Sequence, residues 1–175
     1  MISTFQGHTP VIHPTAWVHP TACIIGQVTI GAHSSVWPYC VIRGDVGAIT
    51  IGAGTNVQDG TIIHVTHAGP YTGEGANTVI GDNVTIGHRA ILHACTIESN
   101  AFIGIASTIL DQAMVRSYAM LGANTLVTGK QIITGKTLWF GQPATAKRSL
   151  TNDTLSYIDY SAQHYQRIMA QYQST

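Results

Sequence analysis

The chain has 175 residues, of which 45% are hydrophobic and 9% are charged, a size and composition that fit one domain with an aliphatic core. Eight basic side chains balance eight acidic ones, and this net charge of zero gives no electrostatic indication of binding to nucleic acid or an anionic membrane. No apolar run approaches the roughly 20 residues of a membrane-spanning helix, and the opening MISTFQGHTP lacks the basic and apolar regions of a secretory leader. We therefore expect a cytoplasmic protein without a nucleic-acid or membrane partner.

A six-residue repeat makes up most of the chain and follows an extended lead-in that contains Pro10, Pro14 and Pro20. Each unit begins with an aliphatic residue, often followed by glycine. These lead residues are Val18, Ile24, Ile30, Val36 and Ile42, and then Ile80, Ile86, Leu92, Ile97, Ile103, Ile109, Val115, Leu121 and Val127. A unit this short buries its apolar face only by stacking on its neighbours, which is typical of a solenoid. At a period of six we predict a parallel β-helix, which we assign to residues 1–150.

The repeat is interrupted twice. Ile42 and Ile51 are nine residues apart, so the segment GDVGA is expected to bulge by about three residues. Between Ile63 and Ile80, the segment HAGPYTGEGANT has the glycine, proline and asparagine content of a protruding loop.

A helix is predicted after the last repeat, within residues 151–175. Thr151 or Asn152 can cap its start, and Asp153 lies in its first turn. Apolar residues then recur at spacings of three and four, and they form one stripe that consists of Leu155, Ile158, Ala162, Tyr165, Ile168 or Met169, and Tyr172. We expect this helix to lie along the solenoid.

Three histidines interrupt the repeat in a pattern that indicates a metal site. His64 and His93 each follow a lead aliphatic residue and are 29 residues apart, the length of one 18-residue coil plus the loop. They should therefore stack on one face, separated by the ~4.8 Å between adjacent strands. His88 lies one repeat before His93, near a corner and on another face. A cyclic trimer that sets this corner against the face of a neighbour would assemble a three-histidine site with an open position for water.

Other readings of the polar residues remain open. The three histidines can also be structural, or one of them can act as a single catalytic base, and no shared register links the other six, His8, His13, His19, His33, His67 and His164. Arg43 and Asp59 interrupt the aliphatic pattern and are expected to pair, because buried charges are seldom left unpaired. Asp111 is interpreted only as a turn residue at the edge of a coil.

Several sequence strings together resemble the gamma-class carbonic anhydrase-like proteins of the hexapeptide-repeat superfamily. They are VIRGDV, NVQDGTIIHV, TIGHRAILHACTI, LVTG and LWFGQPATAKRSL, followed by a helix with YSAQHY. The resemblance extends from residue 10 to about residue 172 and implies a trimeric left-handed β-helix with a C-terminal helix, an exception to the usual right-handed crossover.

The resemblance implies a lyase that hydrates CO2 reversibly to bicarbonate by a zinc-bound hydroxide, with Fe2+ or Co2+ as alternative metals. His64 and His93 would be metal ligands from one chain and His88 the ligand from the next. Arg43 and Asp59 would form an ion pair between subunits of the homotrimer. Gln58 would contact the bound water or hydroxide, and Asp45 would support the neighbouring interface.

The sequence departs from the family prototype at two places. The prototype's loop is acidic, whereas Glu74 is the one acidic residue of this loop and hence the candidate proton shuttle. The prototype's helical asparagine has no clear counterpart, and Tyr160, or less favourably Tyr157, takes its place. Two other functions stay open: acyl transfer or thioester hydrolysis on CoA-linked substrates with one histidine as general base, and a non-catalytic metal-stabilised trimeric scaffold. The number of histidines favours the hydratase over the acyltransferase.

Overall fold

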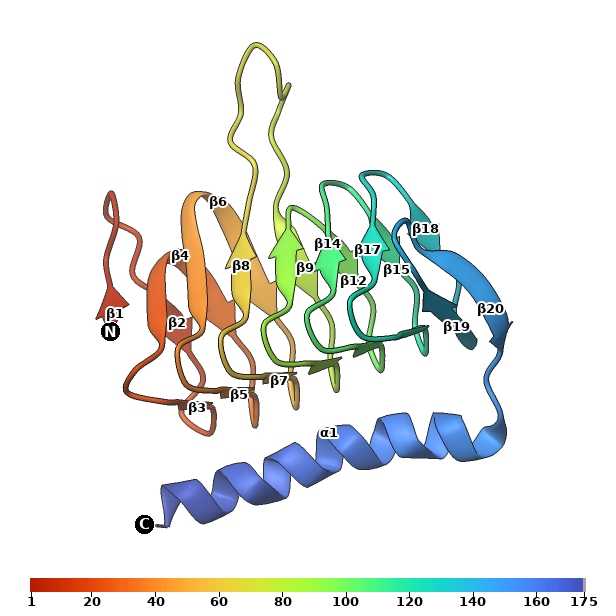
Figure 1. Cartoon of the computed structure of the whole chain (residues 1–175). Coiled ribbons are helices and arrows are strands. Elements are labelled where there is room, and N and C mark those ends of the chain that lie inside the picture. Colours follow the sequence, from red (N-terminus) through yellow and green to blue (C-terminus); the bar gives the residue numbers. More distant parts are fainter. Residues whose placement is uncertain (175) are drawn as a thin grey trace.

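The computed structural model describes residues 1–174 and shows a parallel β-solenoid followed by one helix (Figure 1). This confirms the predicted fold class. Within the described residues, no helix is both long and apolar enough to cross a membrane.

The solenoid has three faces, two of which share long strands that continue round a corner. The first face holds β1 (Ile2–Ser3), the first halves of β4 (Cys23–Ile30) and β6 (Val41–Ile51), β8 (Ile62–His64), β11 (Ile91–His93), β14 (Thr108–Ile109) and β17 (Leu126–Val127). The second face holds β2 (Val11–Ile12), the second halves of β4 and β6, β9 (Thr78–Ile80), β12 (Thr96–Ile97), β15 (Met114–Val115) and β18 (Ile132–Ile133).

The third face is a separate sheet. It holds β3 (Trp17–Val18), β5 (Ser35–Val36), β7 (Asn56–Val57), β10 (Thr85–Ile86), β13 (Phe102–Ile103), β16 (Met120–Leu121), β19 (Thr137–Phe140) and β20 (Thr145–Ser149). Its strands are parallel except β20, which pairs antiparallel with β19 and ends the stack.

The aliphatic lead residues form the core, as the repeat predicts. From Ile24 to Val127 each of them is at most 1% exposed, and Val18 in the first coil is partly buried. The coils stack so closely that glycine is required at some positions. A Cβ on Gly104 would lie 2.5 Å from the backbone of the next coil, at Leu121 and Gly122.

Sharp corners separate the short strands. From Ala94 onward a residue with positive φ recurs every six positions, namely Ala94, Asn100, Ala106, Gln112, Tyr118, Asn124, Lys130 and Lys136. The left-handed conformation turns the chain sharply from one face to the next, so each hexapeptide contributes one strand and one corner.

Both predicted interruptions are present. Along β4 and β6, Gly26 pairs with Gly44 but Val28 pairs with Ile49, so β6 contains three extra residues at the corner. Residues 65–77, between β8 and β9, form a loop that protrudes from the solenoid (Figure 1).

The helix α1 (Asn152–Gln173) runs back along the third face, where it contacts β5, β7 and β10 (Figure 1). The side chain of Thr151 caps it by accepting a hydrogen bond from Thr154 N at 3.3 Å, and Asp153 lies in its first turn. Ile158, Ala162 and Met169 of the predicted stripe are buried. The helix thereby covers the middle of the third face.

Candidate metal centre

His64 and His93 lie side by side on the first face. They occupy the same register position of β8 and β11, which are paired in parallel. His64 Nδ1 is 3.2 Å from His93 Nε2, and the ring centroids are 5.2 Å apart. Both side chains are partly buried. The stacking predicted from their spacing is confirmed.

Each of these rings has a carboxylate on its other nitrogen. His64 Nε2 lies 2.9 Å from Asp45 Oδ1, and His93 Nδ1 lies 2.7 Å from Asp111 Oδ1. A carboxylate accepts the ring proton and thereby fixes the tautomer, which leaves a lone pair on the facing nitrogen of each neutral imidazole. Two lone pairs at this separation repel one another unless a proton or a cation lies between them.

The pair of nitrogens fits a divalent metal ion. Tetrahedral zinc with Zn–N bonds of 2.0–2.1 Å places two ligand nitrogens about 3.3 Å apart, and the two inner nitrogens are separated by 3.2 Å. Within residues 1–174 of a single chain, no group of three histidine, cysteine or acidic side chains is arranged to hold a metal ion. One chain therefore supplies two histidine donors to the candidate site, and a third ligand would have to come from elsewhere.

His88 lies elsewhere, at the corner between the third and first faces. It follows β10 and precedes Arg89, which has a positive φ. His88 Nδ1 is 2.9 Å from Asp59 Oδ2, and both side chains are more than 40% exposed. His88 thus shows the same arrangement as the other two histidines, with a carboxylate on one nitrogen and Nε2 directed away from it.

Two of the predicted ionic residues have partners within the chain. Arg43 forms an ion pair with Asp45, and Asp59 contacts His88. Burial raises the pKa of Asp45, but hydrogen bonds from His64 and Arg43 outweigh it and hold that pKa below its usual range. Asp45, expected to support an interface, therefore also orients His64. The pairing of Arg43 with Asp59 of a neighbouring chain stays a prediction.

Gln58 borders a groove beside His88. Its side chain is 5% exposed, and its Nε2 donates to Asn56 Oδ1 at 3.1 Å. Asn56 Nδ2 donates in turn to Thr85 Oγ1, which donates to Ser161 Oγ of α1. The groove has a volume of about 390 Å³, and its lining includes Gln58, His88, Phe102, Ile105, Met120, Tyr157, Ser161 and Tyr165.

Of the two tyrosines considered for the site, Tyr157 lines this groove and Tyr160 does not. Tyr157 lines the groove together with Ser161 and Tyr165, because residues four apart share one face of a helix. Tyr160 projects from another side of α1, where its ring stacks on His164 at 5.6 Å. Tyr160 is therefore not a groove residue in this chain. Glu74 is exposed in the protruding loop.

Asp111, interpreted from the sequence only as a turn residue, contacts His93 of the candidate site. It lies 18 residues after His93, one coil further along, and this spacing was the available signal. Its second oxygen accepts a hydrogen bond from Thr66 Oγ1. Burial raises the pKa of Asp111, but the hydrogen bonds with Thr66 and His93 hold it below the usual range.

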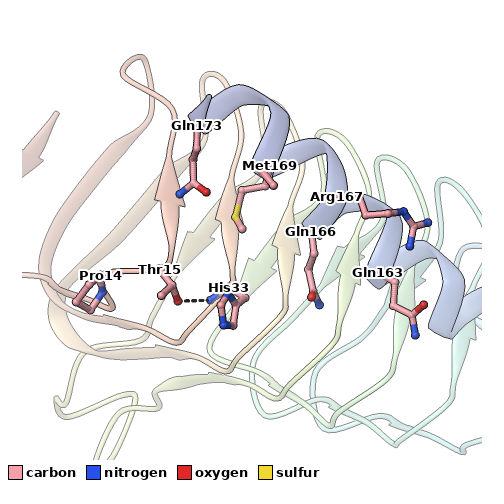
Figure 2. A pocket seen from close by; sticks show the side chains of 9 residues that line it. Pro14, Thr15, His33, Gln163, Gln166, Arg167, Met169 and Gln173 are labelled. Carbon is pink, nitrogen blue, oxygen red and sulfur yellow. Dashed lines mark hydrogen bonds between the residues drawn. The ribbon is translucent and has the colours of Figure 1, made fainter. Parts of the chain in front are cut away.

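A larger groove lies far from these histidines along the chain, between α1 and the first coils (Figure 2). Its volume is about 710 Å³, and it is lined by Pro14, Thr15, His33, Gln163, Gln166, Arg167, Met169, Ala170 and Gln173. This lining contains one imidazole and neither a carboxylate nor a thiol, so it lacks the donors of a metal site.

Comparisons with known proteins agree with the repeat and the fold. A model of the bacterial transferase hexapeptide (six repeats) matches residues 9–44. The mitochondrial gamma carbonic anhydrase 2 of Arabidopsis thaliana is 43% identical over 157 residues, which cover 90% of this chain and 56% of that protein. The carnitine operon protein CaiE of Escherichia coli O157:H7 is 38% identical over 165 residues, which cover 94% of this chain and 81% of that protein.

Two solved structures match almost end to end. A hexapeptide transferase family protein from Anaplasma phagocytophilum has a TM-score of 0.90 at 39% identity, over 98% of this chain and 97% of that one. A putative acetyltransferase from Bacillus cereus has a TM-score of 0.92 at 35% identity, over 99% and 96%.

The three-faced solenoid and its repeat define a hexapeptide-repeat β-helix. The chain belongs to the hexapeptide-repeat superfamily, and within it the chain is similar to the gamma carbonic anhydrases of Arabidopsis. It spans a little over half the length of the Arabidopsis relatives, 56% and 58%.

Proposed function

We propose that this protein hydrates CO2 reversibly to bicarbonate at a zinc site shared between two chains, which makes it a carbon–oxygen lyase. The observation that carries the proposal is the convergence of His64 Nδ1 and His93 Nε2, with a carboxylate behind each ring. The two Arabidopsis relatives bear the name gamma carbonic anhydrase, which supports the same reaction. The cytoplasm is the expected compartment on the sequence argument alone.

His64, His93 and His88 of the neighbouring chain would hold the metal. Zn2+ bound by three neutral imidazoles lowers the pKa of water to about 7 and so supplies a nucleophile at neutral pH. Fe2+ and Co2+ are the alternative ions. The chain's part is to orient the three rings, and Asp45, Asp111 and Asp59 do this by each accepting the proton of one ring nitrogen, so that the other nitrogen is directed at the metal.

Gln58 is placed to orient the reacting water. Its amide nitrogen donates one of its two hydrogens to Asn56, so its carbonyl oxygen would accept a hydrogen bond from water in the groove and its second amide hydrogen could donate one. Proton transfer to solvent is assigned to Glu74 of the loop or to Tyr157 in the groove. Replacement of Glu74 is expected to have a small effect because buffer can bypass a single exposed acid.

A homotrimer would complete the site. On the strands that carry His64 and His93, Ile62 and Ile91 point outward and are 44% and 41% exposed. Two adjacent exposed isoleucines beside the His64–His93 pair favour an interface in which a second copy of the chain buries them. A cyclic arrangement then repeats the same contact at each interface.

The test combines metal analysis with CO2 hydration kinetics between about pH 6 and 9, a window that brackets the ionisation of water on zinc. About one zinc ion per chain and a rate that rises with pH are expected. Metal without hydration at any pH would instead support the non-catalytic metal-stabilised scaffold.

A second candidate is acyl transfer or thioester hydrolysis on CoA-linked substrates, which would use His88 as general base. The observation that favours it is the groove of about 390 Å³, which places Phe102 and Met120 beside the His88–Asp59 pair and exceeds what CO2 requires. Acyl-CoA turnover by metal-free protein, lost in His88→Ala but kept in His93→Ala, would establish this function.

A further inference from the structure

Asp111 connects two parts of the molecule that are distant in sequence. Its Oδ1 lies 2.7 Å from His93 Nδ1, and its Oδ2 accepts the hydroxyl hydrogen of Thr66. Thr66 belongs to the stem of the protruding loop, where it forms a bridge with Ala76 through hydrogen bonds of 3.0 and 2.9 Å. One carboxylate therefore contacts both a candidate metal ligand and the base of the loop.

The contact with His93 fixes which nitrogen of the ring faces the candidate metal position. With the proton of Nδ1 directed at Asp111, Nε2 faces His64. The Asp111 side chain is 40% exposed, so packing alone does not hold its carboxylate in place. The hydroxyl of Thr66 supplies the second contact that does.

The two ends of the loop contact the solenoid, where Val65 is buried in the core and Asn77 Oδ1 accepts a hydrogen bond from Ala48 N at 2.8 Å. Its middle part extends away from the body (Figure 1), and Tyr71, halfway along the loop sequence, is completely exposed. Two cross-loop bridges, Thr66–Ala76 and Gly69–Gly73, give it a hairpin form. Its return strand is held by Thr78, whose hydroxyl donates to the His64 carbonyl at 2.6 Å. The two ends of the loop are thus anchored at the two histidines of the candidate site.

We propose that Asp111 is a positioning residue through which metal binding at His93 and the ordering of loop 65–77 stabilise each other. This inference rests on the proposed metal site, and it adds that the order of loop 65–77 depends on metal binding. A coupling between two sites is reciprocal: if the Thr66–Asp111 contact strengthens metal binding, bound metal must protect the loop stem by the same factor.

The experiment measures Zn2+ and Co2+ affinity by chelator competition, together with the visible spectrum of the Co2+ form. Asp111→Asn is expected to weaken binding about 10- to 100-fold, the usual effect of losing a carboxylate behind a ligand histidine. Thr66→Val removes one hydrogen bond and should weaken binding about 2- to 10-fold, whereas Thr66→Ser keeps the hydroxyl and the affinity. Both weakened variants should alter the Co2+ spectrum.

Matched controls test the same substitutions elsewhere. Thr21→Val removes a hydroxyl from a threonine–histidine pair in the first coils, and Asp82→Asn alters a carboxylate that caps a corner. Neither is expected to change metal affinity. In the wild type, metal should slow hydrogen exchange at the amides of Thr66 and Ala76, and in Thr66→Val this slowing should be lost.

Wild-type metal affinity in Thr66→Val, or loop amides that exchange at the same rate with and without metal, would overturn the coupling. A wild-type protein that binds no metal would overturn both the coupling and the proposed site. Because affinity and exchange are measured without substrate, failure of CO2 hydration alone would remove the proposed reaction and not this result.

Discussion

At the scale of single residues, the candidate site is built from histidine–carboxylate pairs that the solenoid assembles from different coils. Asp45, Asp59 and Asp111 are three of only eight acidic residues, and each lies within 2.9 Å of a different histidine among His64, His88 and His93. A chain with so few charges therefore places a large share of them behind three imidazoles. This use of charge favours ligand histidines over structural ones.

The first prediction concerns His93. In His93→Ala we expect zinc affinity to fall more than about 100-fold, beyond the loss that follows removal of an outer carboxylate. CO2 hydration should disappear with the metal, while circular dichroism and the melting temperature of the metal-free protein stay close to those of the wild type, because the aliphatic column is untouched. His67→Ala, in the exposed part of the loop, is the matched control. Full metal content in His93→Ala would show the ligand assignment to be wrong.

The second prediction concerns the buried thiols. Burial raises the pKa of Cys40 to about 11 and that of Cys95 to about 12. Both should stay unlabelled by thiol reagents at pH 8 in the native protein and react only after unfolding, since the thiolate is the reactive form. Above about pH 9 the unfolded state loses these protons and the folded state keeps them. The free energy of unfolding should then fall by about 1.4 kcal/mol per pH unit for each thiol up to about pH 11.

Denaturant titrations at pH 8, 9 and 10 test this pH dependence. Cys95→Ala is the comparison that isolates one thiol from the tyrosines and lysines that titrate in the same range. An equal loss of stability in the wild type and in Cys95→Ala would contradict the assignment.

Sequence spacing predicted part of the site. His64 and His93 could be placed together because residues one coil apart in a regular repeat occupy the same register. Their spacing of 29 residues, one coil plus the loop, corresponds to the observed pairing of β8 with β11. Asp111 could not be recognised so directly, because aspartate at a coil edge is also a common turn residue. The sequence did not show which of Tyr157 and Tyr160 lines the groove, because the two lie three residues apart and differ in direction by about 60° around the helix axis.

At the scale of elements, stability comes from short strands that each bury one aliphatic residue in a continuous column. Ile103 is 0% exposed and stacks between coils through β13, whereas Ile132 of β18 is 55% exposed on the second face. Ile103→Ala should cost about 2 to 5 kcal/mol of unfolding free energy, from lost burial and the cavity left behind. Ile132→Ala should change it by less than about 0.5 kcal/mol.

Urea unfolding of the two variants, followed by circular dichroism, makes this comparison. The contrast uses the same substitution in neighbouring coils, so it separates burial from strand propensity. Equal costs at the two positions would contradict a core made of one inward residue per hexapeptide.

The elements themselves were largely predictable, for a physical reason. The six-residue period with an aliphatic lead residue predicted the stacking of coils. Segments that break this period predicted the bulge in β6 and loop 65–77. Thr151 and Asp153 gave the start of α1. The left-handed corners were not foreseen residue by residue, because Ala94 and Ala106 have no special preference for positive φ and adopt it under the constraint of stacking.

At the scale of the whole molecule, one chain holds the three histidines of the proposed site in two separate places. The pair His64 and His93 lies on the first face, and His88 lies at another corner with its own carboxylate. No local rearrangement of a stacked solenoid brings the two places together, since each coil is held by its neighbours above and below. A shared site between chains is the arrangement that uses both.

The last prediction tests this sharing directly. His88→Ala and His93→Ala should each bind no zinc as pure proteins. If the two are mixed in equal amounts while unfolded and then refolded together, some interfaces will combine an intact His88 from one chain with an intact His64 and His93 from its neighbour. Random assembly of a cyclic oligomer gives this combination at about a quarter of the interfaces, so about a quarter of the wild-type zinc content should return. A site contained within one chain would return none, because every chain in the mixture lacks a ligand.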